Sequence, residues 1–230
     1  MGQMIKLKAK DGFEVGAYRA DAQGAPKGGL VVIQEIFGVN HHVKNVCDAY
    51  AKDGYTCIAP ALFDRAERDV ELGYDEDARK KGFGLRQKCD WPGILADVDA
   101  ARAALTGVGK LGIIGYCFGG SVVWRACCDL DGFAAGMAFY GGQIHETATV
   151  APKCPVQFHF GEMDQGIPLD KVELIKKAHP ELPVYIYSGA GHGFVCDERG
   201  SFHPDSAKLA RTRALEFMRT HMNPPTARAA

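Results

Sequence analysis

Residues 111–120 read LGIIGYCFGG, an apolar run that leads into a glycine-rich turn around Cys117. A continuous apolar run of this length is typical of a strand that is covered on both faces. The residues after the turn, 118–128, have the spacing of a helix. A Gly-x-Cys-x-Gly turn between a strand and a helix holds its middle residue in strained geometry, with the side chain exposed above the sheet. The sequence therefore predicts that Cys117 lies at a sharp strand-to-helix turn.

This position favours a reactive thiol. The dipole and the free N–H groups at a helix N-terminus stabilise a thiolate, which is the nucleophilic form of cysteine. The alternatives are an inert cysteine at a glycine-rich helix start or a phosphate-binding loop. No Gly-Lys-Ser/Thr follows the turn, and Gly115-Tyr116-Cys117 lacks the second glycine of a dinucleotide-binding fingerprint. A nucleophile is the interpretation that these comparisons favour.

Strands and helices alternate on both sides of the turn. The expected strands are 5–9, 14–19, 30–33, 55–59, 111–115, 133–140, 156–161 and 184–187, and the expected helices are 43–52, 94–105, 118–128, 170–178 and 206–221. This alternation predicts an α/β fold with a mainly parallel central sheet, helices on both faces and an N-terminal hairpin. We expect one domain over residues 1–222 and a flexible tail at 223–230. Residues 61–92 show no sustained periodicity, and we expect a functional excursion there.

Composition excludes several classes of protein. The 230 residues carry 27 Lys and Arg against 28 Asp and Glu, a net charge of −1, which gives no global field to gather nucleic acid. No apolar run approaches the roughly 18 residues that a membrane span needs. The N-terminus lacks a secretory pattern, and the eight cysteines have no zinc-finger spacing. We therefore expect a cytoplasmic protein with free thiols and with neither a metal nor an organic cofactor.

Two further strand ends carry catalytic residue types. Asp164 comes just after the strand at 156–161, and His192 lies in a glycine-rich loop after the strand at 184–187. Cys117, Asp164 and His192 follow the nucleophile, acid and base order of α/β-hydrolases. In such a triad the histidine accepts the nucleophile's proton and the acid fixes the imidazole tautomer. The sequence predicts a Cys-His-Asp triad.

An acyl-transfer site also needs two backbone N–H groups that face the developing oxyanion. One should be the N–H of Phe118, directly after the nucleophile. The other should come from Ile36 in the segment 34–38, QEIFG, which follows the strand at 30–33.

Together these motifs make the chain resemble the dienelactone hydrolase family over nearly its whole length. The motifs that carry the resemblance are QEIFGVN at 34–40, GYCFGG at 115–120, AFYG at 138–141, GEMD at 161–164 and GAGHGF at 189–194. The resemblance implies an α/β-hydrolase fold and a carboxymethylenebutenolidase-like activity, in which a lactone or small ester is cleaved through an acyl-thioester. The implied partner is a small-molecule substrate, and the implied assembly is a monomer or small homo-oligomer.

The resemblance also implies roles for residues that spacing does not identify. Glu35 matches a glutamate that lies beside the cysteine, where its charge opposes a thiolate at rest and where it takes the thiol proton when substrate binds. The family's reference enzyme holds the substrate carboxylate with two arginines. Arg79 is the nearest match to the first, but Cys196 occupies the position of the second, and a thiol cannot bind a carboxylate bidentately. Arg199 lies three positions after Cys196, and its side chain would have to extend back toward that position to bind the carboxylate.

Two aromatic residues complete the expected site. Tyr140 matches a pocket tyrosine of the family, with a plain core position as the alternative. Trp91 ends the excursion and either lines or closes the pocket.

Other functions stay open at this point. A general carboxylesterase or thioesterase of the same fold fits the motifs, and so does a redox-sensing thiol protein. In the cysteine amidotransferase and peptidase group the base adjoins the cysteine or belongs to a His-x-Glu pairing, whereas Phe118 adjoins Cys117 here and the acid precedes the histidine. His41 and His42 follow the expected oxyanion loop, and we expect them at the surface rather than in the pocket.

Overall fold

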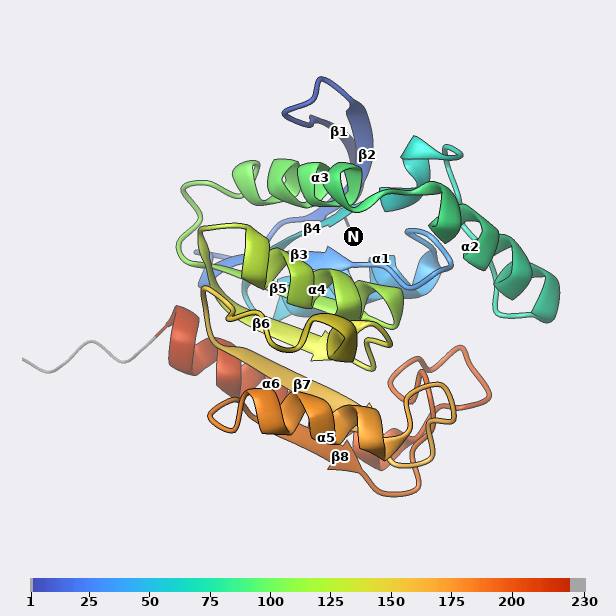
Figure 1. Cartoon of the computed structure of the whole chain (residues 1–230). Helices are drawn as coiled ribbons and strands as arrows, with labels where there is room; N and C mark the ends of the chain where they lie inside the picture. The colour runs from blue at the N-terminus through green and yellow to red at the C-terminus, as the bar shows by residue number, and fades with distance from the viewer. Residues whose placement is uncertain (1, 224–230) are drawn as a thin grey trace, which may run out of the picture.

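The computed structural model describes residues 2–223, and most of these residues surround one eight-stranded sheet (Figure 1). Its strands lie in the order β1-β2-β4-β3-β5-β6-β7-β8. The strands are β1 (Gln3–Lys8), β2 (Glu14–Ala20), β3 (Gly28–Ile33), β4 (Tyr55–Pro60), β5 (Leu111–Tyr116), β6 (Phe133–Phe139), β7 (Val156–Gly161) and β8 (Val184–Tyr187). The tail expected at 223–230 lies, apart from Asn223, outside the described residues.

The strand pairing confirms the predicted fold class. β1 and β2 form an antiparallel hairpin, β2 pairs antiparallel with β4, and all further pairs are parallel. Every residue of β3, β4 and β5 is buried, which explains why these strands are continuous apolar runs.

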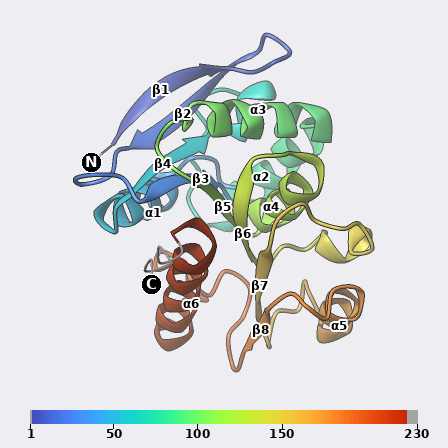
Figure 2. The same ribbon diagram turned by 90° about the vertical axis from the view of Figure 1, so that its left-hand side faces the viewer.

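Helices cover both faces of the sheet. They are α1 (His41–Lys52), α2 (Glu76–Lys88), α3 (Trp91–Ala103), α4 (Phe118–Asp129), α5 (Leu169–Ala178) and α6 (Pro204–Met222), with short 3-10 turns η1 (Leu62–Arg65) and η2 (Ile144–Thr147). Figure 2 shows α1 and α6 on one face and α3, α4 and α5 on the other. Among the described residues, no helix combines the length and the apolar character needed to cross a membrane.

The excursion at 61–92 differs from the sequence prediction, because it contains the regular helix α2. Asp75 caps this helix by accepting from the N–H of Ala78, at 2.8 Å. Few of its residues are buried, so it lacks the apolar stripe by which a helix is recognised in sequence. The short turn η2 was not predicted either.

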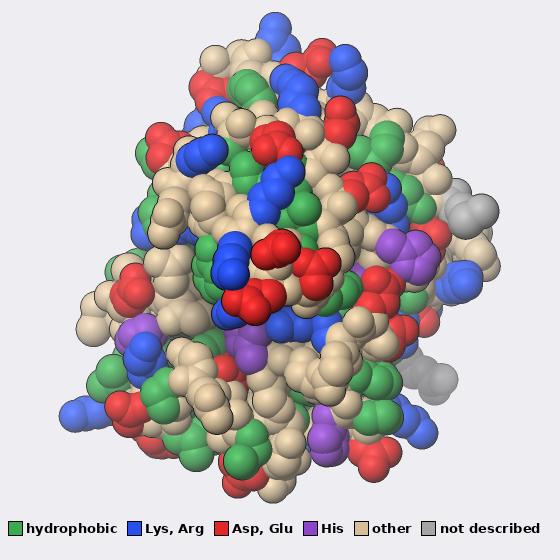
Figure 3. Space-filling view, turned by 90° about the vertical axis from the view of Figure 1, so that its right-hand side faces the viewer, with side chains coloured by type: hydrophobic (Ala, Val, Ile, Leu, Met, Phe, Trp, Pro, Cys, Tyr) green, Lys and Arg blue, Asp and Glu red, His purple; other side chains and the backbone are tan. Residues whose placement is uncertain are grey.

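The carboxyl ends of the parallel strands meet at one side of the molecule, with α2 beside them (Figure 1). Figure 3 shows this side, where acidic and basic side chains and a histidine surround a recess near the middle. In open α/β sheets the functional loops follow these strand ends. Glu35, Ile36, Cys117, Asp164 and His192 lie in these loops.

Candidate active site

Cys117 lies between β5 and α4 with a backbone conformation that is rare for any residue but glycine, φ 55° and ψ −119°. Two flanking glycines make this turn possible. A Cβ atom added at Gly115 would lie 2.3 Å from the carbonyl oxygen of Gly119, and one added at Gly119 would lie 2.5 Å from that of Gln34. Neither position has room for a side chain. The tight turn leaves Cys117 partly exposed at the N-terminus of α4.

His192 and Asp164 lie 28 positions apart in the chain and meet after β7 and β8. His192 Nδ1 lies 2.7 Å from Asp164 Oδ2. The other oxygen of this buried carboxylate accepts from the backbone N–H groups of Gly166, at 2.9 Å, and Ile167, at 3.2 Å. Asp164 is therefore held in place from one side while it orients the imidazole from the other.

The third member lies on the other side of the imidazole. Burial alone lowers the pKa of His192, but the charge of Cys117, hydrogen bonds to Cys117 and Asp164, and the Asp164 charge raise it to about 10. The contacts with Cys117 and Asp164 therefore outweigh burial and favour the charged imidazolium. The structure thus brings together the three predicted triad residues.

The two expected oxyanion residues border the same pocket as Cys117 and His192. Phe118 is the first residue of α4, so its N–H has no acceptor within the helix. Ile36 lies in the loop after β3, and α2 packs tightly against this loop, since a Cβ atom at Gly82 would lie 2.1 Å from the Ile36 carbonyl oxygen. The helix that the sequence did not predict therefore supports one wall of the site.

The pocket has a volume of about 450 Å³ and a mostly apolar lining. It is bordered by Ile36, Phe83, Arg86, Gln87, Cys117, Phe118, Ser121, Gly142, Gln143, Gly166, Ile167 and His192. A cavity of this size and character suits a small organic molecule with one or two polar groups.

The arginine in this pocket is Arg86, whereas Arg79 is exposed and does not border the pocket. Both residues belong to α2 (Glu76–Lys88), so the arginine that borders the pocket lies in the segment that the sequence indicated, seven positions after Arg79. Arg86 stacks over the rings of Trp91, at 5.0 Å, and Phe118, at 4.6 Å. It donates to the carbonyl of Cys89 at 3.0 Å and to Gln143 Oε1 at 3.4 Å.

The two expected aromatic residues lie behind the pocket lining. Trp91 starts α3 and supports Arg86 and Phe118 from below. Tyr140 is fully buried, and its ring packs against His192 with 5.0 Å between ring centroids. Both residues contact groups that border the pocket, but neither borders it itself.

Glu35 forms an ion pair with Arg199. Arg199 Nη1 donates to Glu35 Oε1 at 3.0 Å, and Glu35 is almost fully buried. The second oxygen of Glu35 is buried without a hydrogen-bond partner. Arg199 does reach back from the loop after β8, and its guanidinium lies over the rings of Phe37 and Tyr74. Burial lowers the pKa of Arg199, but Glu35 and neighbouring acidic groups outweigh it and raise the pKa.

Sequence reasoning missed Arg86, Ser121 and Gln143 as pocket residues. Ser121 follows the Gly119-Gly120 pair by one position, and its hydroxyl accepts from the backbone N–H of Gln143 at 3.1 Å. Its place one helical turn after Cys117 was an available signal. Gln143 lies in an irregular loop and carried no such signal.

Comparisons with known proteins agree with this geometry. The model of the dienelactone hydrolase family matches residues 15–222. The carboxymethylenebutenolidase of Pseudomonas putida is 30% identical, over 93% of this chain and 94% of its own length. A Methylorubrum extorquens protein named "Putative carboxymethylenebutenolidase" is 31% identical, over 94% of this chain and 80% of its own length.

A solved structure extends the likeness to three dimensions. The Klebsiella pneumoniae protein described as "Putative Dienelactone Hydrolase" superposes with a TM-score of 0.82 at 27% identity, and the match covers 94% of this chain and 98% of that one. With the family model covering nearly all of the described residues and relatives at 30% identity or more, the chain belongs to the dienelactone hydrolase family.

Proposed function

We propose that this protein hydrolyses small esters or lactones, as a carboxymethylenebutenolidase does, through the triad Cys117, His192 and Asp164. The observation that carries the proposal is the position of Cys117. It stands in a strained turn at a helix N-terminus, beside an imidazole that a buried carboxylate orients, and it faces a pocket of about 450 Å³. Acyl transfer by a triad needs a nucleophile next to a base and an acid that orients the base, and Cys117, His192 and Asp164 are suited to these roles.

In the first step the sulfur of Cys117 attacks the substrate carbonyl carbon. The carbonyl oxygen becomes an oxyanion, which the backbone N–H groups of Ile36 and Phe118 are proposed to stabilise. As the oxyanion collapses, the bond to the leaving oxygen breaks and His192 gives that oxygen its proton. The product of this step is an acyl-thioester on Cys117 and an alcohol, which in a lactone remains part of the same molecule.

In the second step water attacks the thioester. His192, now neutral, takes a proton from the water, and the oxyanion forms again between the same two N–H groups. Collapse of this intermediate breaks the carbon–sulfur bond. A carboxylic acid leaves, His192 is again an imidazolium, and the released thiolate takes back its proton from Glu35.

Glu35 is proposed to receive the thiol proton when substrate binds, as the family resemblance implies. Its hydrogen bond at rest goes to Arg199, and its second oxygen is free to accept. A buried acceptor oxygen without a partner is costly, so this group is suited to take part in a proton transfer.

Arg86 is proposed to hold a carboxylate on the substrate. It borders the pocket next to Phe118, and Trp91 and Phe118 fix the plane of its guanidinium by stacking. Among the described residues it has no carboxylate partner within ion-pair distance. A fixed, unpaired arginine in an apolar pocket favours a carboxylate-bearing substrate.

A neutral ester or a thioester is the second candidate substrate. Cys196 is buried at the position where the reference enzyme has its second arginine, and Arg199 is already paired with Glu35. Among the residues that line this pocket in the described part of the chain, Arg86 is then the one arginine available to a substrate carboxylate. This observation favours a weaker requirement for that group than two arginines would impose.

The cytoplasm is the proposed location, because eight free thiols are the usual state of cysteine in a reducing compartment. A monomer or small homo-oligomer is the proposed assembly.

Acid-quenched intact mass spectrometry tests the mechanism. A reaction with an activated acetate ester, stopped within the first turnover, should show one acetyl adduct, and peptide mapping should place it on Cys117. The adduct should be absent in Cys117→Ala. An adduct on another residue, or turnover without any adduct in the wild type and the variant alike, would contradict the proposal.

A further inference from the structure

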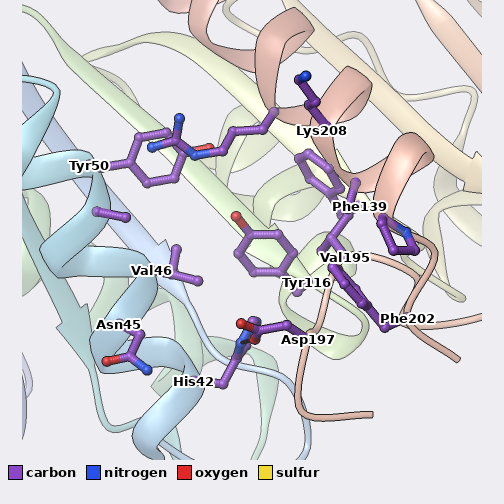
Figure 4. A pocket seen from close by; sticks show the side chains of 14 residues that line it. His42, Asn45, Val46, Tyr50, Tyr116, Phe139, Val195, Asp197, Phe202 and Lys208 are labelled. Atoms are coloured by element: carbon purple, nitrogen blue, oxygen red, sulfur yellow. Dashed lines mark hydrogen bonds and ion pairs between the residues drawn. The ribbon is translucent and has the colours of Figure 1, made fainter. Parts of the chain in front are cut away.

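A second pocket lies on the opposite face of the sheet, between α1 and α6, with a volume of about 400 Å³. Figure 4 shows His42 and Asp197 together at its edge, below Tyr116. His42 comes from the start of α1, and Asp197 comes from the loop after β8 that also carries His192 and Arg199. None of the steps proposed above uses this pocket.

Three different metal-binding side chains meet beside this pocket, and two of them, His42 and Asp197, border it. One donor atom each of His42, Cys196 and Asp197 lie within 4.8 Å of one another. In a tetrahedral site with metal–ligand bonds of about 2.0–2.3 Å, the donor atoms lie about 3.5 Å apart. His42 Nδ1 and Asp197 Oδ1, at 3.3 Å, already have this spacing, so binding requires Cys196 Sγ and these two atoms to approach one another by at most about 1.3 Å.

The imidazole of His42 is not fully satisfied by the protein. Its side chain is only 7% exposed, and Nδ1 lies 3.3 Å from Asp197 Oδ1, which is at the long end for a hydrogen bond. Its Nε2 is buried with no hydrogen-bond partner. A buried imidazole with one weak contact and one vacant nitrogen is an unusual core residue, since unpaired buried polar atoms are costly. The imidazole of His42 therefore has hydrogen-bonding and ligating capacity that the described protein groups do not use.

We propose that His42, Cys196 and Asp197 bind one thiophilic divalent cation of the Zn²⁺ class. A thiolate, an imidazole and a carboxylate are borderline-soft donors that suit Zn²⁺ and its spectroscopic substitute Co²⁺, whereas Mg²⁺ and Ca²⁺ prefer all-oxygen sites. On binding, the Cys196 S–H bond breaks, its proton goes to solvent, and the metal–sulfur bond forms without any change of oxidation state. Three protein donors leave the fourth position to water on the pocket side.

The cation would fasten the loop that carries the catalytic histidine. The backbone N–H of Cys196 donates to the carbonyl of Gly193 at 3.0 Å, and the N–H of Arg199 donates to the carbonyl of Cys196 at 3.2 Å. The bound cation ties this turn to α1 through His42. The expected result is a more stable loop around His192, with the triad itself left free.

Separation in the chain explains why spacing motifs cannot reveal this site. His42 and Asp197 are 155 positions apart, and Cys196 and Asp197 are adjacent, so no ligand spacing of the zinc-finger kind exists.

Cobalt titration of the Cys117→Ala protein tests the proposal, because this variant removes the catalytic thiol as a competing ligand. The expected result is one Co²⁺ per chain, with visible bands typical of tetrahedral cobalt and a near-ultraviolet thiolate charge-transfer band. In this background, Cys196→Ser should abolish the charge-transfer band. Asp197→Asn, a change at the surface that does not threaten folding, should weaken binding about tenfold or more.

Two matched controls separate this cluster from its neighbours. Cys154→Ser changes a thiol outside the cluster, which is partly exposed whereas Cys196 is buried, and should leave the charge-transfer band unchanged. Glu198→Gln removes a neighbouring carboxylate that pairs with His41 instead, and should leave the affinity unchanged. In the same background, Zn²⁺ at a hundredfold excess over its dissociation constant should raise Tm by about 5–10 °C. A charge-transfer band that persists in Cys196→Ser, the absence of any such band in the parent, or equal weakening by Glu198→Gln and Asp197→Asn would overturn the assignment.

Discussion

Arg199 Nη1 donates a hydrogen bond to Glu35 Oε1 across 3.0 Å, although the two residues are 164 positions apart in the chain. This ion pair joins the loop after β3, which carries Ile36, to the loop after β8, which carries His192. Ile36 and His192 both border the pocket of the site. The pair therefore couples the geometry of the expected oxyanion hole to that of the base.

Breaking this pair from one side should be costly. Arg199→Met leaves the buried Glu35 carboxylate without its counter-ion, and we expect a loss of about 3 kcal/mol in the free energy of unfolding. Adding Glu35→Gln to Arg199→Met should recover part of the loss, because it removes the uncompensated charge. Urea denaturation measures both effects.

The exposed pair between Lys80 and Glu76 on α2 is the control for this measurement. Both side chains are more than half exposed, so Glu76→Gln should change stability by no more than about 0.5 kcal/mol. If Glu76→Gln and Arg199→Met lowered the free energy of unfolding by equally small amounts, the Arg199–Glu35 pair would contribute no more to stability than an exposed pair.

Replacing the nucleophile should abolish turnover. Cys117→Ala is expected to lower kcat/KM for an activated ester by on the order of 10³-fold or more, because the nucleophile and its base act as a unit. Cys154→Ser, which changes another partly exposed thiol, should leave kcat/KM unchanged. Steady-state kinetics on purified variants gives the comparison, and substantial residual activity in Cys117→Ala would remove the basis for an acyl-thioester.

The sequence predicted the sheet and the juxtaposition of Cys117, His192 and Asp164 because strong local patterns carried them. Apolar runs marked the buried strands, and glycines marked the turn at Cys117, where a side chain at Gly119 would collide with the carbonyl of Gln34. Parallel strands then brought their carboxyl ends together. Each of these signals lies within a few neighbouring residues.

The predictions failed where a contact depends on distant parts of the chain. Helix α2 packs on the Ile36 loop through Gly82 with few buried residues of its own, so its apolar pattern was too weak to predict it. The position of Arg86 depends on stacking against Trp91 and Phe118, and no local pattern distinguishes it from Arg79. The reach of Arg199 to Glu35 is likewise a property of the folded loops alone.

Two arginines on α2 provide a direct test of substrate charge. Arg86→Ala should raise KM for a carboxylate-bearing lactone about tenfold or more, since a charge-assisted hydrogen bond contributes about 1.5–3 kcal/mol, and should change KM for its methyl ester little. Arg79→Ala, in the exposed position, should change neither value. Michaelis–Menten kinetics of each variant with the carboxylate-bearing lactone and with its methyl ester shows which arginine binds the carboxylate. Loss of the carboxylate preference in Arg79→Ala but not in Arg86→Ala would restore the sequence-based assignment.

The turn at Cys117 should tolerate no side chain at Gly119. In Gly119→Ala the new methyl group would lie 2.5 Å from the carbonyl oxygens of Ile33 and Gln34, so the loop that carries Ile36 must move. We expect a loss of about 2 kcal/mol or more in stability and a fall in kcat.

Gly84→Ala is the matched control, because nothing lies near the added carbon and the position is inside α2. It should stabilise the protein by about 0.5–1 kcal/mol. Thermal unfolding and kcat should be measured for the two variants. Equal changes in stability and in kcat for Gly119→Ala and Gly84→Ala would contradict the predicted steric clash.

The pH dependence of the reaction should depend on Asp164. Although burial lowers the pKa of His192, the charge of Cys117 and then the hydrogen bond and charge of Asp164 are among the causes that raise it from 6.5 to about 10. The imidazolium is therefore present below pH 10 and is lost as the pH rises through that value. Because the first step needs this proton for an alkoxide leaving group, kcat/KM for an alkyl ester should fall with an apparent pKa near 10.

Asp164→Asn removes the carboxylate and should lower the pKa of His192, so the alkaline fall should begin at a lower pH. The loss of the orienting group should also reduce kcat by about 10²–10⁴-fold. An ester with a p-nitrophenolate leaving group is the control, because this group departs without a proton and its acylation should lack most of the alkaline fall. An alkaline limb that stays near pH 10 in Asp164→Asn would mean that Asp164 does not raise the pKa of His192. A limb that appears equally with both esters would mean that His192 is not the proton donor. The alkyl ester and the p-nitrophenyl ester together separate two roles of Asp164. Orientation of the His192 imidazole affects kcat for both esters, whereas the raised pKa of His192 affects the alkaline limb for the alkyl ester.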